Sequence, residues 1–295
     1  MRKGFRGASM ILAFDIGASR IKAAREGLGL GAVATPLTDF AAFVAALRGF
    51  VRGDEHGVAI AMAGVIDSEC GRIKVANIPC VDGRALAADL QAALSVPVLV
   101  LNDADCFALA EIATGAARGH RNVFALILGS GVGGGLVIDG KVVQGAGGYS
   151  GEWGHGPVIR DPAFPCGCGQ VGCLDTVGSA RGLERLHHHL TGKSATSITI
   201  LELWHDGQQS QTIDLWLDLV SGQLAMVLNV VGSSIVPVGG GLSNDPALIA
   251  ALDRALRQRI LRRVDQPLVV VAKTGADAGL IGAAAAGEAA FGYHA

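Results

Sequence analysis

A dense cluster of metal-binding side chains lies just past the middle of the chain. Cys166, Cys168 and Cys173 fall within eight residues, and His155 precedes the first of them by eleven positions. Three thiolates and one imidazole form a complete tetrahedral ligand set for a structural zinc ion. The alternative, a disulfide with one leftover thiol, is disfavoured in a compartment that keeps thiols reduced. Glu152 precedes His155 by three residues, so both side chains point the same way if this turn is helical.

Three glycine-rich segments have the composition of phosphate-binding turns. The first reads Asp-Ile-Gly-Ala-Ser-Arg over residues 15–20, and the second has five glycines in residues 129–135. A third run, residues 239–241, lies between a predicted strand and a predicted helix. Glycine lacks Cβ, so its backbone N–H groups can approach an anion closely. Each segment alone could be an ordinary tight turn, but equivalent placement of the first two favours phosphate binding.

Two carboxylates follow predicted strands directly. Asn102 and Asp103 end one strand and open a helix, which suits either a helix N-cap or a base directed toward a substrate. Phosphoryl transfer to a sugar hydroxyl needs such a base. Asp15 ends another strand beside glycines. It could position Mg²⁺, which prefers oxygen ligands, or bond its own backbone in the turn.

Composition bounds the classes of protein to which the chain can belong. Of its 295 residues, 43 are glycine, 50% are apolar and 17% are charged, which predicts a large buried core. The formal net charge of −2 gives no footprint for nucleic acid. No apolar stretch reaches 18 residues without a charge or turn, so no membrane span is expected. The short apolar run at residues 10–14 reads as a strand, and a cytoplasmic location is expected.

Hydrophobic periodicity predicts an α/β chain with an internal duplication. A strand, a turn and a returning strand open each half, and alternating helices and strands follow. Two such lobes would face each other across a cleft. Predicted strands cover residues 9–14, 21–25, 57–63, 72–76, 97–101, 122–128, 136–138, 142–144, 234–238 and 267–271. Predicted helices cover residues 40–51, 84–94, 106–117, 214–231, 246–258 and 278–291, with further helix from about residue 179.

Together these features resemble the ROK family of bacterial sugar kinases, within the actin/hexokinase/Hsp70 ATPase fold. The resemblance covers residues 10–291, and its most specific part is Glu-Trp-Gly-His at residues 152–155 followed by Cys-Gly-Cys-Gly-Gln-Val-Gly-Cys at residues 166–173. It implies two actin-like (ribonuclease H-like) lobes around a central cleft, with a zinc-binding insertion in the second lobe. The expected first lobe is 1–119, joined by a helix at 280–295, and the expected second is 120–279, with the zinc-binding segment at 150–178.

The resemblance also implies roles for single residues. Asp103 would be the base that activates the sugar 6-hydroxyl, and His155 would bind zinc through one ring nitrogen and sugar through the other. The implied sugar contacts are Gly64, Asn77, Asn102, Asp103, Glu152, His155 and Asp175. The implied contacts to ATP, used with Mg²⁺, are Asp15, Gly17, Ser19, Arg20, Gly129, Ser130, Gly131, Gly133, Gly240 and Gly241. Zn²⁺ would be structural, held by His155, Cys166, Cys168 and Cys173.

Several positions depart from the family pattern. Ala18, Ser19 and Arg20 stand where the family usually has Gly-Thr-Lys, Ala63 replaces a proline, and Asp175 replaces a glutamate. N-acetylglucosamine is the expected substrate, with N-acetylmannosamine and glucose as alternatives. A sugar-sensing transcriptional regulator is a further alternative, disfavoured because only about eight residues precede the first predicted strand. A non-catalytic sugar-binding protein is disfavoured by Asp103. The resemblance implies a homodimer with sugar and ATP as its small-molecule partners.

Overall fold

The computed structural model describes residues 10–208 and 210–292, and the chain divides into two compact units. The first unit takes in the chain up to Thr114, Gln144–Ser150 and the chain from Thr274. The second consists of Gly115–Val143 and Gly151–Lys273. Residues 144–150 and 274–279, expected in the second lobe, therefore fall in the first unit, and residues 115–119, expected in the first lobe, fall in the second. Residue 9 of the first predicted strand and residues 293–295 of the predicted last helix lie outside the described residues.

The first unit is built on a five-stranded sheet in the order β3-β2-β1-β4-β7. β1, β2 and β3 are antiparallel neighbours, whereas β4 and β7 run parallel to β1. The strands and helices of this unit are β1 (Ile11–Ile16), β2 (Arg20–Arg25), β3 (Leu28–Ala34), α1 (Phe40–Arg48), β4 (Gly57–Met62), β5 (Val65–Ile66), β6 (Ile73–Lys74), α2 (Leu86–Leu94), β7 (Val98–Asn102), α3 (Asp103–Ala113) and α9 (Ala278–Phe291). Single 3-10 turns cover Ala146–Gly148 and Gly275–Asp277.

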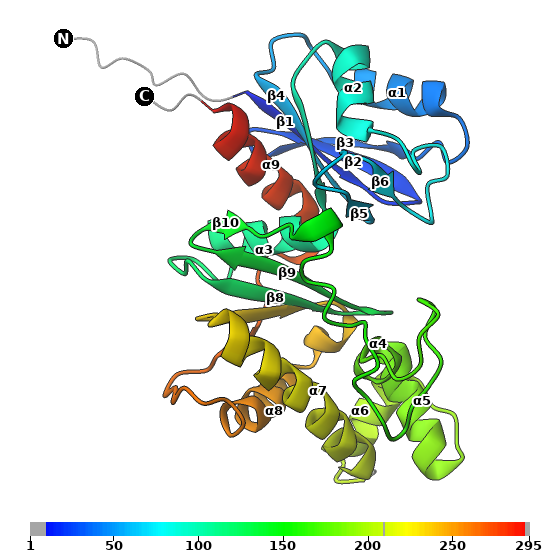
Figure 1. The fold of residues 1–295 in the computed structure, drawn as a ribbon, viewed down its shortest axis with the longest axis vertical. Helices are drawn as coiled ribbons and strands as arrows, with labels where there is room; N and C mark the ends of the chain where they lie inside the picture. Colours follow the sequence, from blue (N-terminus) through cyan, green and yellow to red (C-terminus); the bar gives the residue numbers. More distant parts are fainter. Residues whose placement is uncertain (1–9, 209, 293–295) are drawn as a thin grey trace, which may run out of the picture. The chain divides into compact units, whose positions relative to one another are not determined.

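Both faces of the first sheet are covered, which explains why its central strands β1 and β4 are apolar except for Asp15 near the end of β1. Side chains on one face of β1 and β4, such as Phe14 and Ile60, pack in a cluster with α1 and α2. The alternate residues, such as Ala13 and Ala59, pack against α3 and α9. Figure 1 shows α1 and α2 together on one side of this sheet and α9 on the other. The period of two in a strand places successive side chains in these different layers.

The second unit repeats this topology with a sheet in the order β10-β9-β8-β11-β12. β8, β9 and β10 are antiparallel, and β11 and β12 run parallel to β8 and to each other. Its elements are β8 (Val123–Leu128), β9 (Val132–Ile138), β10 (Lys141–Val142), α4 (Asp175–Gly178), α5 (Ala180–Thr191), α6 (Ser197–His205), α7 (Ser210–Val231), β11 (Val236–Gly239), the 3-10 turn Gly241–Asn244, α8 (Pro246–Arg257) and β12 (Val269–Val271). The matching order of the two sheets supports the predicted internal duplication.

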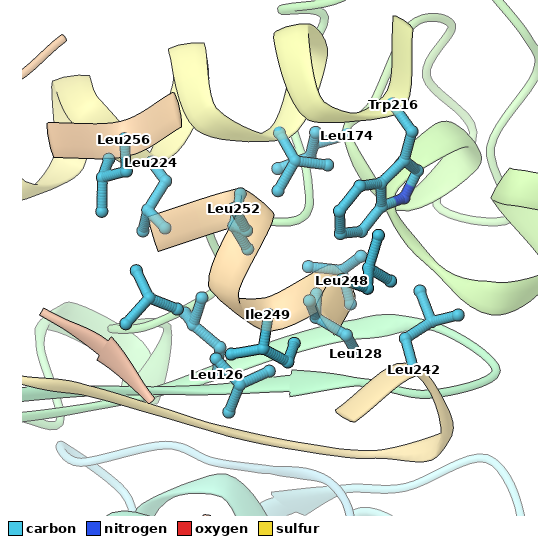
Figure 2. Close-up of a cluster of buried hydrophobic side chains, with 14 of the residues drawn as sticks. Leu126, Leu128, Leu174, Trp216, Leu224, Leu242, Leu248, Ile249, Leu252 and Leu256 are labelled. Carbon is cyan, nitrogen blue, oxygen red and sulfur yellow. The ribbon is translucent and has the colours of Figure 1, made fainter. Parts of the chain in front are cut away.

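The core of the second unit lies between its sheet and two long helices. Figure 2 shows Leu126 and Leu128 of the sheet below Leu252 of α8, with Trp216 and Leu224 of α7 above. Trp216 is fully buried, and its Nε1 donates a hydrogen bond of 3.1 Å to the carbonyl of Gly178. α7 is long and apolar enough to span a membrane by length and composition alone. Its buried side chains belong to this core.

The structure corrects several predicted elements. Strand β9 begins at Val132, so Gly133 lies within a strand and the second glycine turn is limited to residues 129–131. Helix α3 begins at Asp103, three residues earlier than predicted. The strands β3 and β5 were not predicted, whereas α5 and α6 lie in the stretch after residue 179 where helices were expected. β3 is an edge strand whose side chains are almost all exposed, so it lacks the buried apolar face on which strand prediction depends.

Candidate functional site in each unit

Asp103 opens α3 at the end of β7. The N-cap role that the sequence left open belongs to Asn102, whose side-chain oxygen accepts the Ala104 N–H at 2.7 Å. The Asn102 side-chain amide also donates to the Gly64 carbonyl at 2.8 Å, so the structure brings these two predicted residues together. Gly64 has a φ of +130°, and a Cβ there would lie 2.8 Å from the Lys74 carbonyl oxygen, so a glycine is required. This network fixes the strand end from which Asp103 projects.

The Asp103 carboxyl group combines a backbone hydrogen bond with access to solvent. One of its oxygens accepts the Ala104 N–H at 3.0 Å, and its side chain reaches solvent. Desolvation by the surrounding protein raises the pKa of Asp103, and the negative charge of Asp15 adds to the increase. Backbone N–H groups at the helix start oppose this effect. A carboxylate with a raised pKa is a stronger base than an ordinary surface aspartate.

The first glycine turn is a closed hairpin. The Gly17 N–H donates to the Arg20 carbonyl at 3.1 Å, and the Thr35 hydroxyl donates to the Gly17 carbonyl at 2.6 Å. Gly17, Ser19 and Arg20 are exposed at its tip, where a phosphate could reach them. The half-buried carboxylate of Asp15 packs against the first turn of α9, where a Cβ on Gly279 would come within 2.7 Å of it.

Lys22 is a cation of this region that the sequence did not single out. Its Nζ lies 3.3 Å from an Asp15 oxygen and donates to the Ala276 carbonyl at 2.9 Å. The register pairs Asp15 directly with Lys22 across β1 and β2, so both side chains are on the same face of the sheet. This cross-strand pairing was the available signal. Asn77, also predicted to contact sugar, is exposed in the turn after β6.

In the second unit, the second glycine turn and the third glycine run lie side by side. The Gly129 N–H donates to the Gly131 carbonyl at 3.0 Å, and the Ala180 N–H donates to the Gly129 carbonyl at 2.8 Å. Gly240 has a φ of +86°, and a Cβ there would lie 2.5 Å from the carbonyl carbon of Leu128. The structure therefore joins residues 129–131, Gly240 and the start of α5 into one backbone-lined surface.

A pocket opens beside this surface, with a volume of about 430 Å³. Its size falls within the range of small-molecule sites. Apolar side chains of α6 form part of its wall, and polar side chains complete the lining, which consists of Ala180, Ser197, Ile198, Leu201, Glu202, His205, Gly241, Asn244 and Asp245. The predicted helices after residue 179 include this wall but do not fix where α6 begins. The signal for its start is Thr196, whose side chain caps α6 by accepting the Thr199 N–H.

The predicted zinc ligands meet in space. One ligand atom from each of His155, Cys166, Cys168 and Cys173 lies within 4.8 Å of the others. The Cys168 and Cys173 sulfurs are 3.6 Å apart, and the Cys166 sulfur is 3.6 Å from the His155 Nδ1. Tetrahedral zinc with bonds of about 2.3 Å to sulfur and about 2.0 Å to nitrogen needs edges of about 3.8 and 3.5 Å. The four residues therefore fit zinc, and all three cysteines are free thiols rather than a disulfide.

The surroundings shift the pKa values of two of the cysteine thiols in opposite directions. A backbone N–H at Gln170, with the other thiols and His155, lowers the pKa of the exposed Cys168 to about 7. Burial raises the pKa of Cys173 to about 11, although its sulfur accepts the Gly156 N–H at 3.3 Å. Zinc binding would favour the thiolate form of each, because the thiolate is the metal ligand.

His155 presents its two ring nitrogens to different groups. Nδ1 lies beside the Cys166 sulfur, whereas Nε2 lies 3.8 Å from a carboxylate oxygen of Glu152. The intervening segment is a turn rather than a helix, yet it keeps both side chains together, half-exposed. This arrangement has the two-ended geometry that binding of metal and sugar by one imidazole requires.

Asp175 has a partner that the sequence did not suggest. One of its carboxylate oxygens accepts the Val132 N–H at 2.7 Å, immediately after the second glycine turn. The predicted sugar-contacting carboxylate is therefore engaged with the backbone of the predicted phosphate-binding turn.

Comparison with known proteins places the chain in a family. Residues 33–289 match the model of the ROK family, and the chain belongs to that family. It is 34% identical over 297 aligned positions to an N-acetyl-D-glucosamine kinase of Photobacterium profundum, covering 93% of this chain and 98% of the relative. It is 33% identical over 299 positions to an N-acetylgalactosamine kinase of a Shewanella species, covering 95% and 97%.

Solved structures give the same result for the fold. A ROK hexokinase from Thermus thermophilus matches with a TM-score of 0.82 and 28% identity over 93% of this chain and 96% of that chain. A ROK glucokinase from Streptomyces griseus, solved with glucose and AMPPNP, matches with a TM-score of 0.70 and 28% identity over 93% and 98%. The predicted α/β fold of ROK sugar kinases is confirmed.

Proposed function

We propose that this chain is an ATP-dependent hexose kinase that phosphorylates the 6-hydroxyl of N-acetylglucosamine. Asp103 carries the proposal, because it is a carboxylate with a raised pKa at a strand end that Asn102 and Gly64 hold in place. Kinship to kinases of 2-acetamido hexoses, at 33–34% identity over almost the whole chain, supports both the reaction and the substrate class.

In the proposed reaction, Asp103 accepts the proton of the 6-hydroxyl as that oxygen attacks the γ-phosphorus of ATP. The bond to the bridging oxygen of ADP breaks, and the products are the sugar 6-phosphate, ADP and a proton. We assign ring-hydroxyl contacts to Gly64, Asn77, Asn102, Glu152 and His155. Most of the catalysis would come from positioning and from charge stabilisation at the phosphates.

The nucleotide is assigned to the glycine-rich turns. In this proposal ATP phosphates contact Asp15, Gly17, Ser19 and Arg20 of the first unit and Gly129, Ser130, Gly131 and Gly133 of the second. The adenosine would lie over Gly240 and Gly241, beside the 430 Å³ pocket. Mg²⁺ would neutralise the phosphates, with Asp15 as its nearest carboxylate.

Zinc has a structural role in this proposal. His155, Cys166, Cys168 and Cys173 would hold it with no position left for substrate, and the ion would keep residues 155–173 in one conformation. The thiol ligands suit a reducing compartment such as the cytoplasm, which also supplies ATP. A homodimer is part of the same proposal, and light scattering on the purified chain would test it.

N-acetylgalactosamine is the second candidate substrate, because the Shewanella relative is named for it at almost the same identity. The two sugars differ only in configuration at carbon 4. N-acetylmannosamine and glucose follow. The test is ADP release with Mg²⁺, ATP and each of the four sugars. We expect the highest kcat/KM for N-acetylglucosamine, and ATP turnover that no sugar increases would contradict the proposal.

A further inference from the structure

The zinc-binding segment and the second glycine turn are physically connected. The Trp153 indole N–H donates to the Gly133 carbonyl at 3.1 Å, and a Cβ on Gly154 would come within 2.7 Å of the Val132 carbonyl oxygen. Trp153 and Gly154 stand between Glu152 and the zinc ligand His155. The residues before the metal cluster therefore pack closely on the start of β9.

Asp175, just after the last cysteine of the zinc-binding segment, also contacts the second glycine turn. It follows the buried ligand Cys173 by two residues, and its backbone N–H donates to the Gly154 carbonyl at 2.8 Å. Its carboxylate accepts the Val132 N–H at 2.7 Å. A Cβ on Gly131 would lie 2.9 Å from the same carboxylate oxygen, so the side chain packs directly on the turn.

The hydrogen bond to Val132 matters because the turn is rich in glycine. Such a backbone has many conformations and loses the most freedom when it is fixed. A bond from an N–H to an ionised carboxylate is stronger than one between neutral groups. It fixes the peptide that joins Gly131 to Val132, and with it the direction in which the turn presents its remaining N–H groups.

We propose that Asp175 is a positioning residue for the second glycine turn, through which the zinc-binding residues control affinity for the nucleotide phosphates. This inference rests on the proposed function for the identity of the ligand. It assigns Asp175 to the nucleotide side of the reaction, whereas the family resemblance implied a contact with sugar. In this proposal, zinc binding orders residues 155–173. The ordered end of this segment positions Asp175, and the carboxylate of Asp175 in turn fixes the glycine turn through its bond to the Val132 N–H.

The first test compares Asp175→Ala and Asp175→Asn with the native chain, using the matched control Asp218→Ala. Asp218 is an exposed carboxylate on α7 that pairs with Arg259. We expect Asp175→Ala to raise the KM for ATP and the Kd for a non-hydrolysable ATP analogue by about tenfold or more, the ratio that 1.4 kcal/mol produces. The KM for sugar should change little. Asp175→Asn keeps an acceptor for the Val132 N–H. Its KM for ATP and its Kd for the ATP analogue should therefore lie between those of the native chain and those of Asp175→Ala.

The second test needs no variant and no turnover. Chelation of zinc from the native full-length protein should weaken binding of the ATP analogue and speed hydrogen exchange at the Val132 amide, and added zinc should restore both. In Asp175→Ala that amide should exchange fast with or without metal. Nucleotide binding that is equally tight in stripped and loaded native protein would overturn the inference.

A raised KM for sugar with an unchanged KM for ATP in Asp175→Ala would also overturn it, because the carboxylate would then be a sugar ligand. If Asp175→Ala does not fold, Asp175→Asn and the chelation experiment decide the matter. A chain that binds nucleotide in a zinc-dependent way but phosphorylates no sugar would retain this inference and refute the proposed function.

Discussion

An asparagine in place of Asp103 keeps the shape of the side chain and removes its ability to accept a proton. The substitution should leave the local structure intact, because Asn102 caps α3 and an asparagine oxygen can still accept the Ala104 N–H. Loss of a general base costs about 10²- to 10⁴-fold in turnover. At 1.36 kcal/mol per tenfold, this corresponds to about 2.7 to 5.4 kcal/mol of transition-state stabilisation. We expect kcat to fall by this factor with a nearly unchanged KM.

The same substitution should stabilise the fold at neutral pH. Desolvation by the neighbouring protein raises the pKa of Asp103 above its unfolded value, although the side chain reaches solvent, so the ionised carboxylate destabilises the native state at any pH above its folded pKa. A neutral asparagine avoids this cost. The advantage of Asp103→Asn in free energy of unfolding should therefore be full at pH 7, decrease as the pH falls through the folded pKa, and vanish below the unfolded one.

The assays are coupled ADP release and urea unfolding at several pH values. The control is Asp89→Asn, which changes an acidic residue in the first turn of α2 that pairs with Arg84. It should change both turnover and stability little, because surface substitutions generally stay within about 0.5 kcal/mol. A kcat for Asp103→Asn within tenfold of the native value would refute the role of Asp103 as the base. A lower free energy of unfolding for Asp103→Asn than for the native chain at pH 7 would contradict the argument that desolvation raises the pKa of Asp103.

Three further results are expected. In the native protein, kcat/KM should decrease as the pH falls through the raised pKa of Asp103, because protonation removes the base. Measuring kcat and kcat/KM for the sugar across a range of pH values tests this. Gly282→Ala should destabilise the fold by about 1–3 kcal/mol or more in urea unfolding, because the new Cβ would lie 1.8 Å from the Cys106 carbonyl, whereas Gly29→Ala meets no atom within 4 Å and should be tolerated. Metal analysis should find one zinc per chain, and Cys173→Ser should lose it and lower the Tm; full retention of zinc in that variant would contradict the ligand assignment.

Much of the fold could be predicted because its central strands are buried and most of its helices are long apolar or amphipathic runs bounded by turn residues. The central strands β4 and β8 are apolar runs, as is β1 apart from Asp15, and the last helix, Ala278–Phe291, has the bounds of the helix predicted at 278–291. Edge strand β3 lacks such a pattern, because most of its residues face solvent. Gly133 lies in a strand instead of a turn because it pairs with Ile127 across β8 and β9. This pairing depends on which strands lie side by side, which the glycine-rich local sequence does not reveal.

The residues of the candidate site likewise divide into those that local sequence predicts and those whose contacts depend on the tertiary structure. That His155 and the three cysteines gather in space could be predicted because a metal set depends on residue types and spacing, and the place of Asp103 could be predicted because it follows an apolar strand. Lys22 and the bond between Asp175 and Val132 depend on which strands and segments lie side by side. Local sequence does not encode these contacts, so the role proposed for Asp175 could not be predicted from it.

The central claim is most directly tested by the specificity constant for N-acetylglucosamine in a coupled assay of ADP release with ATP and Mg²⁺, measured beside N-acetylgalactosamine, N-acetylmannosamine and glucose. The account predicts sugar-dependent turnover, formation of the 6-phosphate and the highest kcat/KM for N-acetylglucosamine. Turnover that is independent of every sugar, or a product phosphorylated at another hydroxyl, would contradict it.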